Sequence, residues 1–446
     1  MSYTNGHTTY TLEELARINL EAQQAANTAA MAGIPVPASP PPPPPIMGDD
    51  RLREVLTHLT CDVEHTPPSQ MLNYLIELNT LGMKVPFRKF AEISTLTTFG
   101  SLFGRKYKTI DGLSSALMML LAAPTGSGKG EAFTFWQKQF SRLTVNTNRP
   151  PNFYTGSATS AQGLHGAVQK IGTTVWIRHD AAGDLAMLAA PNGSTQIGFR
   201  DYVYELFDAS AYAAAPMQPV ASVAANMRKD EPIHNATVGM LWSTTPTAFS
   251  ETYSQSVLST GLGSRMLVTV HDAPAGDSVP DSQVLRDLPG TMFEILAGIA
   301  NEVADLDAAY ANPAEAFKRI ARIAYSPDAA ALLWRVEQAV NNVRRGVDNK
   351  RLPAHYAVFA RTSMLTKKIA LTAALVRNRF DCRIEYADVA YALAFVVRAL
   401  GSLAAMFDSG AVGGGDDRAR MAAIVGWLRT FATSNHPRVT TKCGTQ

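Results

Sequence analysis

The stretch "LSSALMMLLAAPTGSGKGEAF", residues 113–133, sets an apolar run directly against a glycine-rich loop and a helix-forming segment. An apolar run of this kind is typical of a strand buried on both faces of a parallel sheet. The loop comes close to the phosphate-loop pattern, in which four spacers separate a small residue from Gly-Lys-Ser/Thr. Ala123 to Lys129 fit this pattern, whereas Gly130 stands where the hydroxyl belongs. The segment therefore predicts a strand, a phosphate-binding loop and a helix.

In such a loop, backbone N–H groups and the N-terminus of the following helix point at phosphates. We expect eight consecutive residues to bind ATP: Pro124, Thr125, Gly126, Ser127, Gly128, Lys129, Gly130 and Glu131. Lys129 would place its charge on the outer phosphates. The missing hydroxyl normally ligates Mg²⁺, although a water can take its place. Gly130 thus weakens the case for hydrolysis and leaves the case for binding intact.

Further strands are expected at 173–180, 236–246 and 264–272, so the middle of the chain is predicted to be α/β. The first of these strands ends at Asp180, the acid that we expect to hold Mg²⁺ at the carboxyl edge of the sheet. Ala181 follows it, where a catalytic Glu would be usual. Asp184, Asp208 and Glu131 are possible substitutes for polarising water. His179 is expected to pack or to form hydrogen bonds rather than to bind metal.

The strand at 236–246 ends in "STTP", where Ser243, Thr244 or Thr245 could sense the outermost phosphate or orient water; a strand-end turn with hydroxyl caps is the alternative. Arg265 follows a glycine-rich turn at the start of the next strand. The turn would project its guanidinium away from the chain's own loop and toward the nucleotide of a neighbouring subunit. An ordinary surface arginine is the alternative.

The net charge of +2 and the 17% of charged residues argue against a globally basic surface for nucleic acid. Any such contact is left to local clusters, of which Arg228 and Lys229 in "NMRKDEP" are the best placed. A second cluster lies at 344–351, and a third is formed by Lys367 with Lys368. Clusters of this size are more often solvated faces.

The sequence divides into five parts. Residues 1–48 form an arm, with a helix expected from Thr11 to about Ala30 and a polyproline spacer at Pro40 to Pro45. Residues 49–110 are a helical segment, 111–285 the α/β core and 286–408 a helical domain. Residues 409–446 are a glycine-rich linker, a short helix and a tail.

The composition favours a soluble, cytoplasmic protein with a sizeable core. Hydrophobic residues make up 46% of the chain, and the three cysteines lack the spacing of a disulfide framework or metal site. No signal peptide is apparent at the N-terminus. The apolar stretch "YALAFVVRALGSLAAMF" is interrupted by Arg398 and is short of a membrane span, so no membrane contact is expected.

The order of "FGSLFGRKYKTIDG", "APTGSGKG", the strand ending at Asp180, "LFDAS", "STTP", "GLGSRM" and "RTSMLTKKIALTAALV" resembles a family of P-loop ATPases encoded by phages, plasmids and prophages. Members of this domain-of-unknown-function group are commonly called primase-helicases or replicative helicase-like proteins. The resemblance covers roughly residues 68–405. It implies nucleotide binding by Lys129, metal coordination by Asp180 and a trans-acting Arg265 in a ring. The family usually has Ser or Thr where Gly130 stands and an acid where Ala181 stands.

We therefore expect a P-loop NTPase core of RecA-like or AAA+ type, mainly a parallel sheet, flanked by N-terminal helices and a C-terminal helical domain. The first functional hypothesis is an oligomeric ATPase that acts on single-stranded DNA in the replication of a mobile element. The second is a non-motor nucleotide-binding scaffold or loader that partners a primase or another replication protein. A small-molecule kinase is disfavoured because no arginine-rich lid is found.

Overall fold

The computed structural model describes residues 2–5, 8–11, 67–143, 152–156, 160–171, 173–188, 197–211, 233, 236–252, 265–271, 276–309, 320–346 and 361–408. The chain divides into two compact units, residues 1–50 and 51–446. In the first unit, β1 (Ser2–Asn5) pairs antiparallel with β2 (Thr8–Thr11), a hairpin that the sequence does not predict. The helix and polyproline spacer expected after Thr11 lie outside the described residues.

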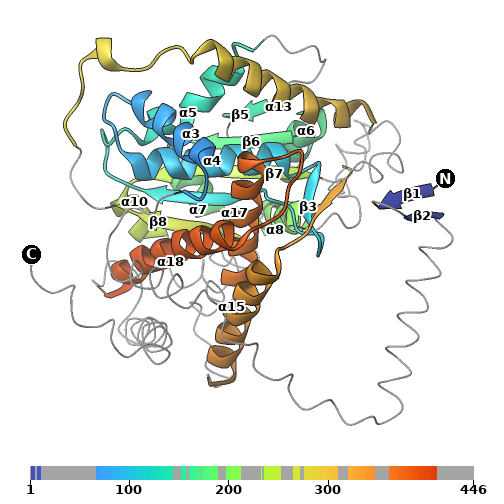
Figure 1. The fold of residues 1–446 in the computed structure, drawn as a ribbon. Helices are drawn as coiled ribbons and strands as arrows, with labels where there is room; N and C mark the ends of the chain where they lie inside the picture. The colour runs from blue at the N-terminus through green and yellow to red at the C-terminus, as the bar shows by residue number, and fades with distance from the viewer. Residues whose placement is uncertain are drawn as a thin grey trace, which may run out of the picture. The chain divides into compact units, whose positions relative to one another are not determined.

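A five-stranded parallel sheet forms the centre of the second unit (Figure 1). Its strands, in spatial order, are β5 (Asn152–Tyr154), β6 (Thr173–Arg178), β7 (Thr237–Thr244), β4 (Met118–Ala122) and β8 (Leu267–Val270). Every neighbouring pair is parallel. The α/β prediction and four of its strands are thereby confirmed, whereas β5 is too short to stand out in the sequence.

The strand β4 shows why the apolar run is nearly unbroken. Met119 and Leu121 face one hydrophobic core, and Met118 and Leu120 face a second core on the other side of the sheet. Successive side chains of a strand point to opposite faces, so a strand covered on both sides needs an apolar residue at every position.

Helices cover both faces. The first core takes in α3 (Gln70–Leu81), α4 (Arg88–Phe103) and α5 (Lys129–Phe140), which lie together in Figure 1. The second core takes in α6 (Ala161–Ile171), α7 (Ala182–Leu188), α8 (Ile197–Ala211) and α10 (Pro246–Thr252). The helix after the loop and the helical segment at 49–110 follow from apolar spacing; residues 49–66 of that segment lie outside the described residues.

The C-terminal helices are α13 (Gly290–Ala309), α15 (Pro327–Gly346), α17 (Thr362–Arg377) and α18 (Tyr386–Asp408). A 3₁₀ turn, η1 (Asp281–Gln283), precedes them, and β9 (Ala321–Ile323) pairs in parallel with β3 (Tyr107–Thr109). Buried side chains of all four helices belong to the same core as α3, α4 and α5. The boundaries expected at 110 and 285 therefore do not separate the hydrophobic core, and the C-terminal helices form a layer on the sheet unit.

The helix α18 covers the outer edge of the sheet. Ser402 on this helix accepts a hydrogen bond from the backbone N–H of Val270 on the edge strand β8, at 3.0 Å. Edge strands left bare tend to pair with other chains, and a covering helix prevents this. The Arg398 that interrupts the apolar stretch is paired with Glu92 of α4, which also accepts a hydrogen bond from Tyr391 at 2.7 Å.

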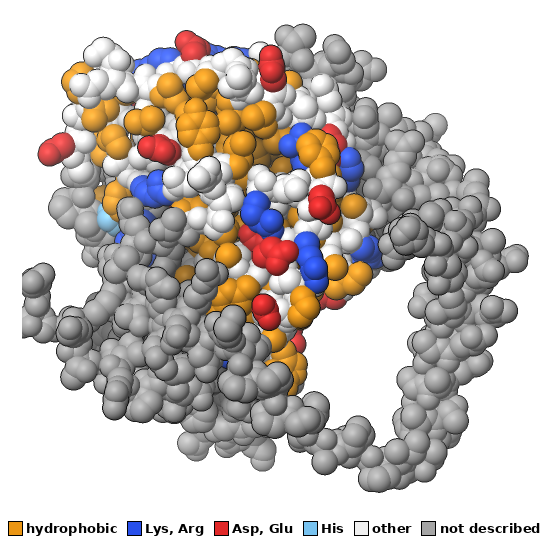
Figure 2. Space-filling view, in the orientation of Figure 1, with side chains coloured by type: hydrophobic (Ala, Val, Ile, Leu, Met, Phe, Trp, Pro, Cys, Tyr) orange, Lys and Arg blue, Asp and Glu red, His pale blue; other side chains and the backbone are white. Residues whose placement is uncertain are grey.

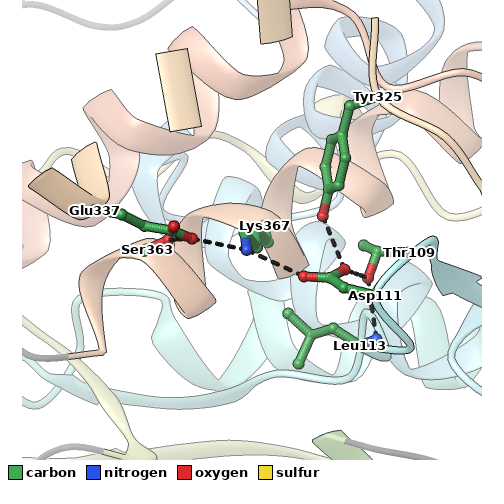
Figure 3. Close-up of polar contacts among 7 residues, drawn as sticks. All are labelled: Thr109, Asp111, Leu113, Tyr325, Glu337, Ser363 and Lys367. Carbon is green, nitrogen blue, oxygen red and sulfur yellow. Dashed lines mark hydrogen bonds and ion pairs between the residues drawn. The ribbon is translucent and has the colours of Figure 1, made fainter. Parts of the chain in front are cut away.

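A polar cluster fixes α15 and α17 to the turn after β3 (Figure 3). The ammonium of Lys367 lies 3.0 Å from Asp111 and 2.9 Å from Glu337, and Tyr325 donates to Asp111 at 3.3 Å. Ser363 donates to the same Glu337 at 3.0 Å. Lys367 is thus engaged within the chain rather than presented to nucleic acid.

Its neighbour Lys368 is fully buried and donates to the backbone oxygen of Ala116 at 2.6 Å. Burial, reinforced by the nearby Arg361, lowers the pKa of Lys368 to about 7. The sequence placed Lys367 and Lys368 in a basic cluster that could contact DNA, and this placement is wrong for both side chains. Periodic spacing does not reveal which lysines of a helix face the protein interior.

No helix within the described ranges combines the length and apolar character that a membrane crossing would require.

Candidate functional site

The order of the strands marks one edge of the sheet for ligand binding. From β4 the chain continues through α5, which packs on the first core, and from the adjacent β7 it continues through α10, which packs on the second. The connections that follow these two neighbouring strands therefore run on opposite faces of the sheet. Ligands of open α/β sheets bind outside the carboxyl ends of the strands at such a switch point.

A cavity of about 500 Å³ opens at this point. Its walls come from the loop after β4, the segment after β6, the end of β7 and the connection between α3 and α4. The lining residues are Lys84, Val85, Thr125, Gly126, Gly128, Lys129, Gly130, Glu131, His179, Asp180, Thr244 and Thr245. Ligand pockets usually fall between about 300 and 1,000 Å³, so the cavity has the size of a small-molecule site.

The glycine loop, residues 123–131, has the backbone geometry that its glycines permit. Gly126 and Gly128 have φ of 81° and 83°, the left-handed region that side-chain-bearing residues avoid. Gly128 immediately precedes α5, and a Cβ there would stand 2.6 Å from the backbone oxygen of Val85. Ser127 is buried, and its hydroxyl donates to the oxygen of Pro124 at 2.8 Å. Pro124 and Ser127 thus shape the loop, while the other six predicted binding residues line the cavity.

The side chain of Lys129 is hydrogen-bonded both to the glycine loop and to the end of β7. Its ammonium donates to the backbone oxygen of Thr244 at 2.9 Å and to that of Ala123. Burial lowers the pKa of Lys129, and the charge of Asp180 opposes that effect. The lysine therefore joins the loop to the end of β7 and stands beside the acid predicted to bind metal.

Asp180 and His179 leave the end of β6 together, and both are exposed into the cavity. The structure places Asp180 after β6, on the wall of the cavity that the glycine loop also lines. His179 lines the same cavity, and its expected packing or hydrogen-bonding role stays a prediction. Burial, with Arg178 and Lys138 nearby, lowers the pKa of His179 and favours the neutral ring. Within the described ranges, no three His, Cys, Asp or Glu side chains gather as a complete metal site.

The hydroxyls predicted to sense phosphate have different surroundings. Ser243 is fully buried and donates to the backbone oxygen of His179 at 2.7 Å, so its hydroxyl fixes the end of β6 instead of reaching a ligand. The backbone oxygen of the same Ser243 accepts from Ala181 at 2.9 Å. Thr244 lines the cavity, but its side chain is only 1% exposed. Thr245, one residue further, also lines the cavity and is more exposed.

Arg265 lies at the other edge of the sheet. It lies two residues before β8, whose amino end is opposite the glycine loop because β8 runs parallel to β4. Its guanidinium binds Asp208 at 2.8 Å and stacks on the ring of Tyr204 at 4.6 Å, leaving the side chain 15% exposed. Arg265 thus lies away from its own glycine loop, as predicted, and within this chain its guanidinium is held by α8. Its role toward a neighbouring subunit stays a prediction.

The candidates for polarising water are engaged elsewhere. Asp208, bound to Arg265 and 3.6 Å from Arg361, lies at the amino edge and cannot serve the glycine loop. Asp184 is buried and paired with Arg178 at 2.8 Å. Burial raises the pKa of Asp184 although this guanidinium opposes it. Glu131 lines the cavity, but its carboxylate accepts from the backbone N–H of Lys84 at 2.6 Å.

Lys84 and Val85 are part of the site that the sequence does not predict. They reach the cavity because α3 and α4 pack against α5, and the contact between Lys84 and Glu131 closes this wall. The residues stand some forty positions before the glycine loop, and no local motif marks them. The predicted nucleic-acid residues, Arg228 and Lys229, lie outside the described residues. Figure 2 shows basic and acidic side chains interspersed on the visible face of the described part, not gathered into one basic surface.

No protein-family model matches this chain, and no curated protein sequence matches it.

The environment of Gly130 leads to a prediction about stability. Apart from chain neighbours and the backbone of its own helix, a Cβ at this position would meet the Nδ1 of His179, at an ordinary contact distance of 3.6 Å. We expect Gly130→Ser to leave the free energy of unfolding within about 1 kcal/mol of wild type or to raise it slightly, because serine favours a helix over glycine. Gly128→Ser is the matched control. It should cost at least about 1–2 kcal/mol because of the positive φ and the clash with Val85. Urea unfolding measures both; equal losses for the two variants would contradict the assigned loop geometry.

Proposed function

We propose that the chain binds a nucleoside triphosphate, ATP in the first instance, at the carboxyl edge of its sheet. The observation that carries this proposal is the convergence of the glycine loop, Lys129 and Asp180 on one cavity at the switch point of a parallel sheet. Phosphates need closely approaching N–H donors and positive charge, and a loop with two left-handed glycines at the start of α5 supplies both.

The residues present also fit a divalent cation. Asp180 offers a carboxylate from the wall facing Lys129, and it is the residue that would hold the ion, Mg²⁺ by the expectation from sequence. A bound ion neutralises charge on the outer phosphates. Lys129 would exchange its bonds to Ala123 and Thr244 for phosphate oxygens, which leaves the ammonium desolvated but paired.

We infer that turnover is slow compared with binding. Each carboxylate considered for orienting water is either paired or turned to a backbone donor, and position 181 is an alanine. Proteins that position a water poorly still bind the nucleotide, because binding uses the loop and the lysine instead.

Two wider roles remain as proposals: a ring-shaped motor on single-stranded DNA, and a non-motor scaffold or loader for a primase or other replication partner. The motor requires Arg265 to reach the nucleotide of a neighbouring subunit. Its engagement with Asp208 and Tyr204 favours the scaffold, because those contacts would have to break in every cycle.

The rate of ATP hydrolysis with and without single-stranded DNA separates these roles. We expect a low rate that DNA does not stimulate, and we expect Arg265→Ala to change this rate less than threefold. If the chain is a motor, DNA should stimulate hydrolysis and Arg265→Ala should nearly abolish it, because an arginine supplied in trans accelerates phosphoryl transfer by about 10³–10⁵-fold. Stimulation by DNA, a ring in sedimentation and an inactive Arg265→Ala variant that Lys129→Ala subunits rescue would establish the motor.

A further inference from the structure

The glycine loop lacks a hydroxyl at position 130, and the structure shows what occupies the space beside it. Apart from its chain neighbours and the backbone of its own helix, the atom nearest to a Cβ at this position is the Nδ1 of His179, at 3.6 Å. An imidazole nitrogen of the described part therefore lies next to the position where the loop pattern usually has a hydroxyl.

The segment that carries this ring is fixed on β7. Ser243 donates its hydroxyl to the backbone oxygen of His179 at 2.7 Å, and its backbone oxygen accepts from Ala181 at 2.9 Å. The two bonds flank Asp180. His179 and Asp180 are consequently presented to the cavity as a pair, one with a nitrogen donor and the other with a carboxylate.

We propose that the divalent cation of this site is held by the imidazole of His179 together with the carboxylate of Asp180, the ring taking the place of the hydroxyl that Gly130 lacks. The proposal rests on the nucleotide binding proposed above. The two side chains, the nucleotide's phosphate oxygens and waters would complete the coordination shell. A catalytic cation site with few protein ligands keeps positions open for substrate and water.

The chemistry of the two donors sets the metal preference. Mg²⁺ binds oxygen ligands and gains little from an imidazole, whereas ions later in the first transition series bind nitrogen progressively better. We therefore expect Co²⁺ to exceed Mg²⁺ in affinity by a larger factor in wild type than in a variant without the ring. Free ATP and ADP also discriminate between these ions. The informative comparison is therefore between the Co²⁺ to Mg²⁺ affinity ratio of wild type and that of the variant without the ring.

Binding of ADP with Mn²⁺ gives a direct readout of the ligand that does not depend on turnover. We expect the electron spin echo spectrum of the Mn²⁺–ADP–protein complex to show coupling to an imidazole nitrogen in wild type and none in His179→Ala. The Co²⁺ to Mg²⁺ affinity ratio should fall at least about tenfold in the same variant. His179→Asn, which keeps a polar side chain of similar reach, should also lose the nitrogen coupling. Asp180→Asn should weaken binding of all the ions.

ADP binding in the presence of EDTA separates this proposal from the one on which it rests. If ADP binds without metal and the wild-type Mn²⁺ complex shows oxygen ligands alone, His179 is not a ligand and only the metal proposal fails. Nitrogen coupling that persists in the His179→Ala variant would also overturn the metal proposal. If neither ADP nor ATP binds, with or without metal, the nucleotide site itself is wrong and both proposals fall.

Discussion

Replacing Lys129 with alanine is expected to weaken ATP binding by at least about 100-fold. The ammonium lies beside the glycine loop, held by the oxygens of Ala123 and Thr244, and the loop, residues 123–131, has no other basic residue. Lys84 also lines the cavity, but its ammonium is paired with Asp281 at 3.3 Å. Hydrogen bonds to charged groups contribute about 1.5–3 kcal/mol each, and about 1.4 kcal/mol corresponds to a factor of ten in affinity. Loss of two such bonds accounts for the expected factor. Titration with a fluorescent ATP analogue measures it.

Arg383→Ala is the control for this variant. Arg383 lies between α17 and α18, is exposed and does not line the cavity. Its removal changes the net charge equally and should alter the affinity less than about twofold. Equal affinity of wild type and Lys129→Ala would remove the phosphate-binding role of the loop.

Replacing Glu92 with alanine is expected to have the largest effect on stability. Glu92 is 5% exposed and binds Arg398 and Tyr391, so it connects α4 with α18 in the core that supports the glycine loop. Burial, together with the charge of Glu92, raises the pKa of Tyr391 well above its usual value. Removing one partner of a buried ion pair leaves the other without compensation and costs about 3–5 kcal/mol. Urea unfolding should register this loss.

Glu77→Ala on the neighbouring α3 is the control, because Glu77 is exposed. It should change the free energy of unfolding by no more than about 0.5 kcal/mol. The loss of unfolding free energy in Glu92→Gln should lie between the losses in Glu77→Ala and Glu92→Ala, because the amide oxygen can still accept a hydrogen bond from Tyr391. A Glu92→Ala variant as stable as wild type would show that the contact between α4 and α18 is misassigned.

The sequence predicts those parts of the fold that depend on neighbours along the chain. The strand β4, the loop that follows and α5 are recognisable because apolar run, glycine spacing and helical spacing are all local. The end of β6 at Asp180 follows from the same logic, since the carboxyl ends of parallel strands share one edge. These elements bring Lys129 and Asp180 together without any knowledge of the remaining chain.

Partners that are distant in sequence could not be predicted. Arg265 has a glycine-rich turn before it and appears exposed in the sequence, yet it is bound by Asp208, 57 positions away on α8. Arg398 interrupts an apolar helix because Glu92, 306 positions away, lies opposite it. Short strands such as β3 and β9 pair with each other across more than 200 positions of the sequence, and three residues each are too few to carry a periodic signal.

Amide hydrogen exchange with and without ATP tests the central claim most directly, because it reports where on the chain the nucleotide binds. The account predicts slower exchange in peptides spanning residues 124–133, whose N–H groups would bind phosphates, and in those spanning 82–87 and 179–181. It predicts no change in α17, residues 362–377, which lies away from the cavity. Protection confined to α17 or to the region of Arg265, or no protection at saturating ATP, would contradict a nucleotide site at the glycine loop.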